Sequence, residues 1–361
     1  MDYEEFFRED FDRIEQYKPG EQPTEEGWVK LNTNENPYPP PQVILDEIKM
    51  SVNDKLRLYP DPTAKYLRQM ISSVLLVDKN TLTNPRSVFI DNGSDGILEN
   101  IMKAIVDPGD QVDYFYPSYG MYRVLSMCYR AKRNEVKLTE DFSIPDEAYS
   151  LKGKLMFVNS PNNPNGKAFS KNTISKLCSS YPGIVAVDEA YGDFCEISAL
   201  PLLKEFKNLI VVRTFSKSFS LASLRMGYAV ADPEIIKALN KVRLPYNVNY
   251  LTQIAAVSCI KHRDLIKKQN EKIISERTRL TEAISQYNGV SVEPSDANFI
   301  FIKFSEKSVC LKFNWDLREK DMLVRHFSSP GLYQFLRVSV GTPEDNSKFL
   351  EVFDEIAQKY L

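Results

Sequence analysis

Short apolar runs alternate with amphipathic helical segments through the middle of the chain. The helical segments, such as GILENIMKAIV, carry apolar residues every three or four positions. The apolar runs between them are VFIDN, DQVDYFY, KLMFVNS, IVAVD and LIVVRT. Strands that alternate with helices predict a doubly wound α/β sheet. In such a sheet, functional groups gather beyond the carboxyl ends of the strands.

The two ends of the chain have different patterns. The first residues form an amphipathic stretch, with a short helix predicted over residues 3–17, and an arm this short must pack on the body or on a partner subunit. Beyond Pro245, a helical stretch from about residue 251 to 287, several apolar strands and a closing helix predict an α+β unit. The predicted organisation is an arm (1–28), a large α/β domain (29–245) and a small C-terminal domain (246–361).

Composition argues against several classes of partner. The 361-residue chain has a formal net charge of -3, so it offers no basic surface for nucleic acid or anionic lipid. No apolar run approaches the roughly 18 residues that span a bilayer. The five cysteines are far apart and only two histidines accompany them. We therefore expect neither a disulfide framework nor a metal site, and a reducing cytoplasm fits best.

Lys217 has unusual surroundings for a lysine. It follows the apolar run LIVVRT in the hydroxyl-rich segment TFSKSFS, without a nearby acidic residue and with Arg213 and Arg225 close in sequence. Like charges favour a neutral amine, and a neutral lysine is the form that attacks carbonyl compounds. The commonest interpretation of such a lysine is a solvated side chain in a Ser-rich loop, so the functional interpretation depends on the rest of the chain.

Polar residues beyond the other strand ends are the matching groups for one cofactor. Pyridoxal 5'-phosphate needs a lysine, a carboxylate at its ring nitrogen, donors to its phenolic oxygen, an aromatic face and a phosphate cup. Taken singly, these residues have ordinary interpretations as turns or helix caps. In the order of those needs, the candidates are Lys217; Asp188; Asn163 with Tyr191; Tyr119; and Gly93, Ser94, Asp95, Ser216 and Arg225.

Two arginines are candidates for binding an anionic substrate. Arg337 lies inside the apolar strand QFLRVSV, where an inward guanidinium would cost several kcal/mol unless an internal acid or a ligand met it. Arg325, in MLVRHF, raises the same question less sharply because it can point outward.

From about residue 17 to its C-terminus, the chain resembles the fold-type I pyridoxal-phosphate-dependent aminotransferases, and among them the histidinol-phosphate aminotransferases. The matching segments, all in family order, include LNTNENPYPPP, YPDPTAKYLR, DNGSDGILENI, YPSYGMY, SPNNPNGKAF, VDEAYGDF, TFSKSFSLASLRMGYA and LRVSVGTPEDN. The resemblance implies a large doubly wound α/β domain, a smaller C-terminal α+β domain and an N-terminal arm.

The resemblance also implies a role for each matching residue around the cofactor. Lys217 would form the Schiff base, Asp188 would bind the ring nitrogen, and Tyr191 and Asn163 would bind the phenolic oxygen. Tyr119 would stack on the ring. The implied phosphate cup consists of Ser94, Asp95, Thr214, Ser216 and Arg225.

Further implied roles concern the partner subunit and the substrate. Tyr59 would reach the cofactor phosphate of the neighbouring subunit, which makes a homodimer the expected assembly. Arg337 would take the substrate's carboxylate or phosphate. The distal end of the substrate would be lined by Arg325, Asn36 and Tyr17.

The implied reaction moves an amino group between glutamate or 2-oxoglutarate and a small phosphorylated substrate, with histidinol phosphate and imidazole acetol phosphate as first choice. Two alternatives stay open: another phosphorylated ketone or amino alcohol, such as dihydroxyacetone phosphate and serinol phosphate, or decarboxylation of a phosphorylated amino acid. The chain departs from the family at Gly96, where an acid is usual, at His326, where a proline is usual, and over the following segment FSSPGLYQF. We expect these positions to lie near the substrate.

Two other classes of function are disfavoured. A regulator built on this fold would need an added DNA-binding helix pair and a basic patch, and the sequence has neither. A nicotinamide-dependent dehydrogenase would carry GxGxxG after its first strand, and this chain does not.

Overall fold

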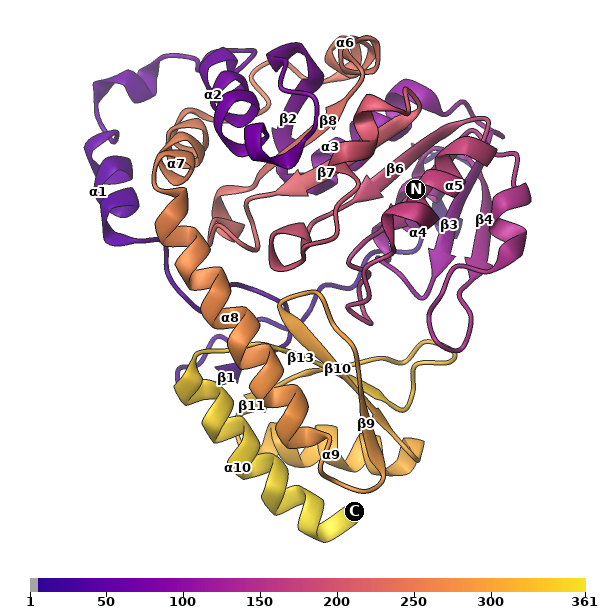
Figure 1. The fold of residues 1–361 in the computed structure, drawn as a ribbon, viewed down its shortest axis with the longest axis vertical. Helices are drawn as coiled ribbons and strands as arrows, with labels where there is room; N and C mark the ends of the chain where they lie inside the picture. Colours follow the sequence, from indigo (N-terminus) through magenta and orange to yellow (C-terminus); the bar gives the residue numbers. More distant parts are fainter. Residues whose placement is uncertain (1–5) are drawn as a thin grey trace.

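A computed structural model describes residues 6–361 and centres on a seven-stranded sheet with the strand order β2-β8-β7-β6-β5-β3-β4 (Figure 1). Neighbouring strands pair in parallel except at β8, which runs antiparallel to both β2 and β7. The strands are β2 (Val88–Asn92), β3 (Gln111–Tyr116), β4 (Lys132–Lys137), β5 (Leu155–Asn159), β6 (Ile184–Asp188), β7 (Leu209–Thr214) and β8 (Met226–Ala231).

Helices cover both faces of this sheet. Successive strand residues point to opposite sides, and since both sides are apolar, both must be covered. Val211 belongs to one core and Val212 to the other. The helices in the first core are α1 (Gln42–Met50), α2 (Lys65–Met70), α5 (Lys171–Ser180) and α7 (Tyr250–Lys261). Those in the second are α3 (Gly93–Ile105), α4 (Met121–Cys128) and α6 (Pro233–Val242).

A second, four-stranded antiparallel sheet lies below the first in Figure 1, with the order β12-β13-β10-β9. A third apolar core packs against it. The strands are β9 (Val290–Glu293), β10 (Phe299–Phe304), β12 (Arg325–His326) and β13 (Phe335–Ser339). The accompanying helices are α8 (Arg263–Ile284), α9 (Lys307–Glu319) and α10 (Pro343–Tyr360).

Two elements pack against a different part of the fold from the one that their position in the sequence suggests. β1 (Val29–Lys30) pairs in parallel with β11 (Met322–Leu323), so the chain just after the arm joins the C-terminal core. Helix α7, although it follows Pro245, packs its apolar residues into a core of the large sheet.

Some predicted elements differ from the observed ones. The helix predicted over residues 251–287 is two helices, α7 and α8, that meet at His262. The sequence does not predict strands β1, β4, β8 and β9. In the described part of the arm, the predicted helix is replaced by mostly irregular chain with a short 3-10 turn at Phe11–Arg13, and residues 3–5 of that prediction lie outside the described residues. A helix this short lacks the internal hydrogen bonds to hold itself without extensive packing.

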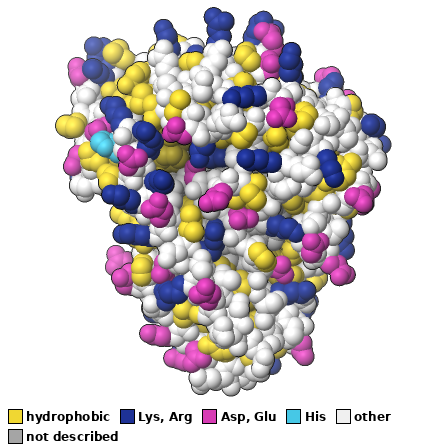
Figure 2. Space-filling view, in the orientation of Figure 1, with side chains coloured by type: hydrophobic (Ala, Val, Ile, Leu, Met, Phe, Trp, Pro, Cys, Tyr) yellow, Lys and Arg dark blue, Asp and Glu magenta, His cyan; other side chains and the backbone are white. Residues whose placement is uncertain are grey.

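The surface carries both signs of charge. Figure 2 shows Lys and Arg side chains interspersed with Asp and Glu over the visible face, as the counts of 46 basic and 49 acidic residues would suggest. Within residues 6–361, no helix is long and apolar enough to cross a membrane. The same residues contain no cluster of three or more His, Cys, Asp or Glu side chains that could hold a metal ion.

Candidate active site

A cavity of about 470 Å³ opens at the carboxyl ends of β3, β5, β6 and β7. Segments of the arm and of the C-terminal sheet complete its wall. The structure brings most of the predicted site residues to this cavity. They are Tyr17, Ser94, Asp95, Tyr119, Asn163, Asp188, Tyr191, Thr214, Ser216, Lys217, Arg225, Arg325 and Arg337.

Three predicted site residues lie outside the cavity lining. Gly93 adopts φ +72°, and a Cβ there would come within 2.7 Å of the Arg225 guanidinium, so this glycine makes room for the arginine. Asn36 donates from its side-chain amide to the Ser218 carbonyl at 3.2 Å, behind the lysine segment. Tyr59 is 80% exposed and stacks on Tyr246 with a centroid separation of 4.4 Å.

Lys217 projects its amino group into the cavity just beyond the end of β7. Its Nζ donates to the Thr33 carbonyl at 3.0 Å and lies 5.8 Å from the centre of the Tyr191 ring. Burial lowers the pKa of Lys217 to about 8, and the positive charges of Arg337 and Arg225 act in the same direction. A substantial fraction of the amine is therefore neutral and nucleophilic near physiological pH.

The predicted contribution of Arg213 to this shift is wrong. Arg213 precedes Lys217 by four residues, but its guanidinium is held by the carboxylates of Glu189 and Asp193. Arg337, from the distant strand β13, is the cation with the largest effect on the lysine. Closeness in sequence identified Arg225 but not the stronger charge of Arg337, because it does not show which way a side chain points.

Asp188, the last residue of β6, lies on the strand next to the one that leads to Lys217. Its carboxylate accepts from the Tyr122 hydroxyl at 2.8 Å through Oδ2 and from the Ala190 backbone N–H at 3.1 Å through Oδ1. Burial raises the pKa of Asp188 to about 6, while these two hydrogen bonds oppose the rise. The group is therefore mainly ionised at neutral pH.

Two predicted ligands of the phenolic oxygen lie on the same wall. The Asn34 side-chain amide donates to the Tyr191 hydroxyl oxygen at 3.0 Å, and burial raises the pKa of Tyr191, so this phenol keeps its proton to donate. The Asn163 side-chain carbonyl accepts from Arg337 at 2.5 Å, which leaves the Asn163 amide N–H groups for a ligand.

Hydroxyl groups and a guanidinium converge near the N-terminus of α3. Thr214 Oγ1 lies 3.0 Å from Ser216 Oγ, and Arg225 donates to Ser216 at 3.3 Å and to the Asp95 carboxylate at 3.1 Å. The hydroxyl of Tyr119 donates to the other Asp95 oxygen at 2.9 Å. Helix N–H groups, hydroxyls and an arginine suit a phosphate group. The Asp95 carboxylate itself could not donate to phosphate, so only its backbone N–H suits the predicted role.

Two arginines stand opposite each other on adjacent strands over the cavity. Arg325 of β12 is the register partner of Arg337 of β13. Arg337 is 7% exposed and donates only to uncharged acceptors, the side-chain carbonyl of Asn163 and the backbone carbonyl of Asn32, while its Nε has no partner in the described chain. Burial lowers the pKa of Arg337 to about 10, and Arg325 adds to the effect. A cationic pair with spare donors favours an anionic ligand.

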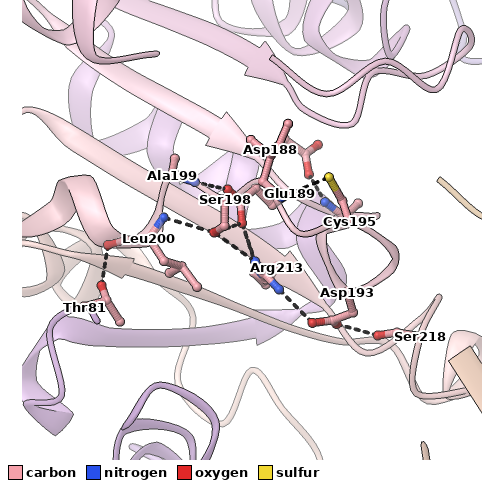
Figure 3. Close-up of polar contacts among 12 residues, drawn as sticks. Thr81, Asp188, Glu189, Asp193, Cys195, Ser198, Ala199, Leu200, Arg213 and Ser218 are labelled. Atoms are coloured by element: carbon pink, nitrogen blue, oxygen red, sulfur yellow. Dashed lines mark hydrogen bonds and ion pairs between the residues drawn. The ribbon is translucent and has the colours of Figure 1, made fainter. Parts of the chain in front are cut away.

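Sequence reasoning missed a buried ion-pair network behind this wall (Figure 3). The guanidinium of Arg213 donates to Glu189 at 2.5 and 2.9 Å and to Asp193 at 2.7 Å. Asp193 also accepts from the Ser218 hydroxyl at 2.6 Å. The network thus ties the segment after Asp188 to the residue after Lys217. A signal existed in the arginine of the apolar run LIVVRT, but the sequence does not show its partners.

Other contributors to the site were missed because they resemble core or turn residues. Tyr122 occupies an apolar position of α4, and Thr33, Asn34 and Glu35 belong to the turn-rich segment LNTNENP. Only the spatial arrangement identifies them, since each acts through a group far away in the sequence.

Of the positions that depart from the family pattern, Gly96 and His326 do not line the main cavity, whereas Phe327, Ser329 and Leu332 of the segment FSSPGLYQF do. A Cβ at Gly96 would lie 3.1 Å from the Asp91 carboxylate, and neither residue lines the cavity. His326 Nε2 lies 3.0 Å from the Tyr333 carbonyl and faces a smaller adjacent cavity of about 190 Å³, which shares Asn32 and Arg325 with the main one.

Comparisons with known proteins agree with this geometry. Residues 26–353 match the family described as aminotransferase class I and II. The chain is 36% identical over 350 residues to the histidinol-phosphate aminotransferase of Geotalea uraniireducens, which covers 97% of this chain and 99% of that protein. It is also 36% identical over 334 residues to the histidinol-phosphate aminotransferase of Synechocystis, covering 92% of this chain and 93% of that one.

Solved structures share the fold. The histidinol-phosphate aminotransferase from Sinorhizobium meliloti, solved in complex with pyridoxal-5'-phosphate, superposes with a TM-score of 0.81 at 21% identity, covering 92% of this chain and 91% of that one. An aminotransferase from Staphylococcus aureus superposes with a TM-score of 0.83 at 19% identity and covers 98% and 100%.

Proposed function

The chain belongs to the class I and II aminotransferases, and we propose that it moves an amino group between glutamate or 2-oxoglutarate and a small phosphorylated substrate. Histidinol phosphate and imidazole acetol phosphate are the first choice, because proteins named for that reaction match over nearly the whole chain. The observation that carries the proposal is the cavity that holds Lys217 and Asp188 beneath the paired Arg325 and Arg337.

Pyridoxal phosphate, when bound, supplies the electron sink that lets a substrate carbon lose its proton. Lys217 would bind the cofactor through Nζ, and the ionised Asp188 would hold a proton on the ring nitrogen. Tyr191 and Asn163 offer donors for the phenolic oxygen. The residues proposed to surround the ring and phosphate are Gly93, Ser94, Asp95, Tyr119, Thr214, Ser216 and Arg225.

The chain's own residues would move the proton and hold the substrate. Once the substrate's amine has displaced Lys217 from the cofactor, the freed neutral amine would take the proton from the substrate carbon that carries the amino group, and its lowered pKa suits that exchange near neutral pH. Arg337 and Arg325 hold the substrate's anionic groups, since a guanidinium pairs bidentately with either a carboxylate or a phosphate. One pocket can therefore accept both glutamate and a phosphate ester, with Tyr17 toward its distal end.

We further propose that the active form is a homodimer in the cytoplasm. Tyr59 lies outside the cavity of its own chain, is 80% exposed and stacks on Tyr246, and the sequence neighbours Leu58 and Leu244 are also exposed. This placement supports a Tyr59 that reaches the cofactor phosphate of a second subunit. All five cysteines are free, as a reducing compartment allows. Within each subunit we propose an arm (1–28), a large cofactor-binding part (29–245) and a small part (246–361), whose first helix, α7, packs on the large part.

A substrate panel tests the proposal. The purified protein, loaded with pyridoxal phosphate, is assayed with 2-oxoglutarate and histidinol phosphate, serinol phosphate or phosphothreonine, with glutamate and carbon dioxide both measured. We expect glutamate formation, fastest with histidinol phosphate. Release of carbon dioxide without glutamate would contradict transamination, and a preference for serinol phosphate would contradict the first-choice substrate. Sedimentation of the same sample tests the dimer.

A further inference from the structure

The carboxylate of Asp188 has one donor on each oxygen. Tyr122 donates its hydroxyl to Oδ2 at 2.8 Å, and the backbone N–H of Ala190 donates to Oδ1 at 3.1 Å. An ionised carboxylate can accept about four hydrogen bonds, so both oxygens keep room for a further partner. Tyr122 is the one side chain in the described part of the chain that donates to this carboxylate, and it does not line the cavity.

Packing fixes the position of the Tyr122 hydroxyl. The ring is fully buried and stacks on Phe157 of β5 with a centroid separation of 4.8 Å and an interplanar angle of 8°. Tyr119 meets it edge-on at 5.7 Å. With its ring held on two sides, Tyr122 can aim its hydroxyl in one direction, toward β6. Replacement by phenylalanine would remove the hydroxyl and leave these ring contacts in place.

We propose that Tyr122 is a positioning residue for the reaction: its hydroxyl keeps the Asp188 carboxylate ionised and turned toward the cofactor's ring nitrogen. The inference rests on the proposed function, because Asp188 can bind the ring nitrogen only if pyridoxal phosphate occupies the cavity. Tyr122 itself touches neither cofactor nor substrate, so its effect passes through Asp188.

The surroundings of Asp188 leave Tyr122 as the main support for the charge. Asp95 of α3 and the adjacent Glu189 are negative and oppose ionisation, as burial does. Tyr119 and Tyr191 also face the group, and burial raises the pKa of each phenol, so both stay neutral. Burial and the nearby Asp188 raise the pKa of Tyr122 well above its ordinary value. Tyr122 therefore remains a protonated donor at every pH at which the enzyme would work.

The same sheet contains a matched control. The buried Tyr181 donates its hydroxyl to the buried Asp113 of β3 at 2.6 Å. Tyr181 precedes the start of β6, whereas Asp188 ends that strand, and neither Tyr181 nor Asp113 lines the cavity. Tyr181→Phe thus breaks a tyrosine–aspartate hydrogen bond of the same kind, but away from the proposed cofactor site.

The experiment measures the dissociation constant of pyridoxal phosphate between pH 6 and 9 for wild type, Tyr122→Phe and Tyr181→Phe, each as full-length protein stripped of cofactor. Loss of a hydrogen bond to a charged group changes an equilibrium by about tenfold or more. We expect Tyr122→Phe to weaken binding by that factor near pH 6.5. Removing the donor raises the pKa of Asp188, so the ratio of variant to wild-type constants should shrink as rising pH ionises the carboxylate again.

Tyr181→Phe should leave the dissociation constant of pyridoxal phosphate and its pH dependence at wild-type values. Its loss of folding stability should be similar to that of Tyr122→Phe, because each variant loses one tyrosine–aspartate hydrogen bond. In an Asp188→Asn background, adding Tyr122→Phe should produce no pH-dependent loss, because the titrating group is gone. Wild-type pH dependence in Tyr122→Phe, or the same loss in both phenylalanine variants, would overturn the inference alone. A wild-type protein that binds no pyridoxal phosphate would overturn the proposed function and this inference together.

Discussion

Arg213 and Arg337 lie within apolar strands and are both almost fully buried, at 2% and 7% exposed, yet their surroundings are opposite. Burial alone would lower the pKa of Arg213, but the carboxylates of Glu189 and Asp193 raise it above its ordinary value. Burial lowers the pKa of Arg337 to about 10, and only uncharged oxygens accept from it. The first arginine has its counterions within the fold, whereas the second has none among residues 6–361.

This difference separates a structural charge from a binding charge. In a buried ion pair, each charge is compensated within the fold, and removing one partner leaves the other buried without its counterion. A buried cation without an anion destabilises the folded protein, and binding an anionic ligand offsets that destabilisation. Arg213 should therefore matter mainly for stability, and Arg337 mainly for substrate.

The largest expected effect is on folding. Arg213→Met leaves Glu189 buried without its cation, which costs about 3–5 kcal/mol. Urea unfolding of the cofactor-free protein measures the loss. A loss of stability below about 1 kcal/mol would contradict the structural role assigned to Arg213.

Arg337→Met should instead reduce activity strongly and stability only slightly. Losing one partner of a buried charged contact costs about 2–5 kcal/mol, so we expect kcat/KM to fall about a hundredfold or more for both glutamate and the phosphorylated substrate. The same variant should keep its stability to within about 1 kcal/mol, because the charge has no carboxylate to strand. The exposed Arg263, at the start of α8, provides a control: Arg263→Met should change neither quantity.

A smaller effect is expected at the neighbouring Arg325. This side chain is only partly buried and donates weakly to the Lys18 and Pro19 carbonyls at 3.4 and 3.5 Å. Arg325→Met should lower kcat/KM for the phosphorylated substrate by about tenfold, and the difference from wild type should narrow as salt is added. A loss as large as that of Arg337→Met would show that the two arginines act as one unit.

The smallest effect is a shift in the titration of Lys217. The amine is protonated below its pKa of about 8, so the rate of covalent attachment of pyridoxal phosphate should rise as pH increases through that value. Arg337→Met removes a positive charge that holds the pKa down, and the midpoint should move to higher pH, by about one unit or less. Stopped-flow absorbance from pH 6.5 to 9.5 gives both midpoints. A downward shift would contradict the assigned charge effect.

The two arginines also show how far sequence reasoning reaches. LIVVRT and QFLRVSV carry the same signal, an arginine in an apolar strand, but within the described chain Arg213 contacts acidic side chains and Arg337 contacts none. The partner of each is decided by which strands and loops become neighbours. The aminotransferase family and its fold, predicted from motif order, are confirmed, because a long series of matching segments depends on no single contact. The individual site roles remain predictions.

The missed strands have local causes. β4 reads KRNEVK, and as the edge strand of the sheet it exposes most of its side chains, so it shows no apolar run. β8, MGYAVA, is apolar and fully buried, but it directly follows the lysine segment and was treated as part of that motif. Its antiparallel insertion between β2 and β7 depends on long-range pairing that no local pattern shows.

The most direct test of the account identifies the residue that carries the cofactor. Pyridoxal phosphate is added to the purified protein, the bond between them is reduced with borohydride, and the digested protein is mapped by mass spectrometry. The account predicts a phosphopyridoxyl group on Lys217, and none in Lys217→Ala, which should also be inactive. The group on a different lysine, or full turnover by Lys217→Ala, would contradict it.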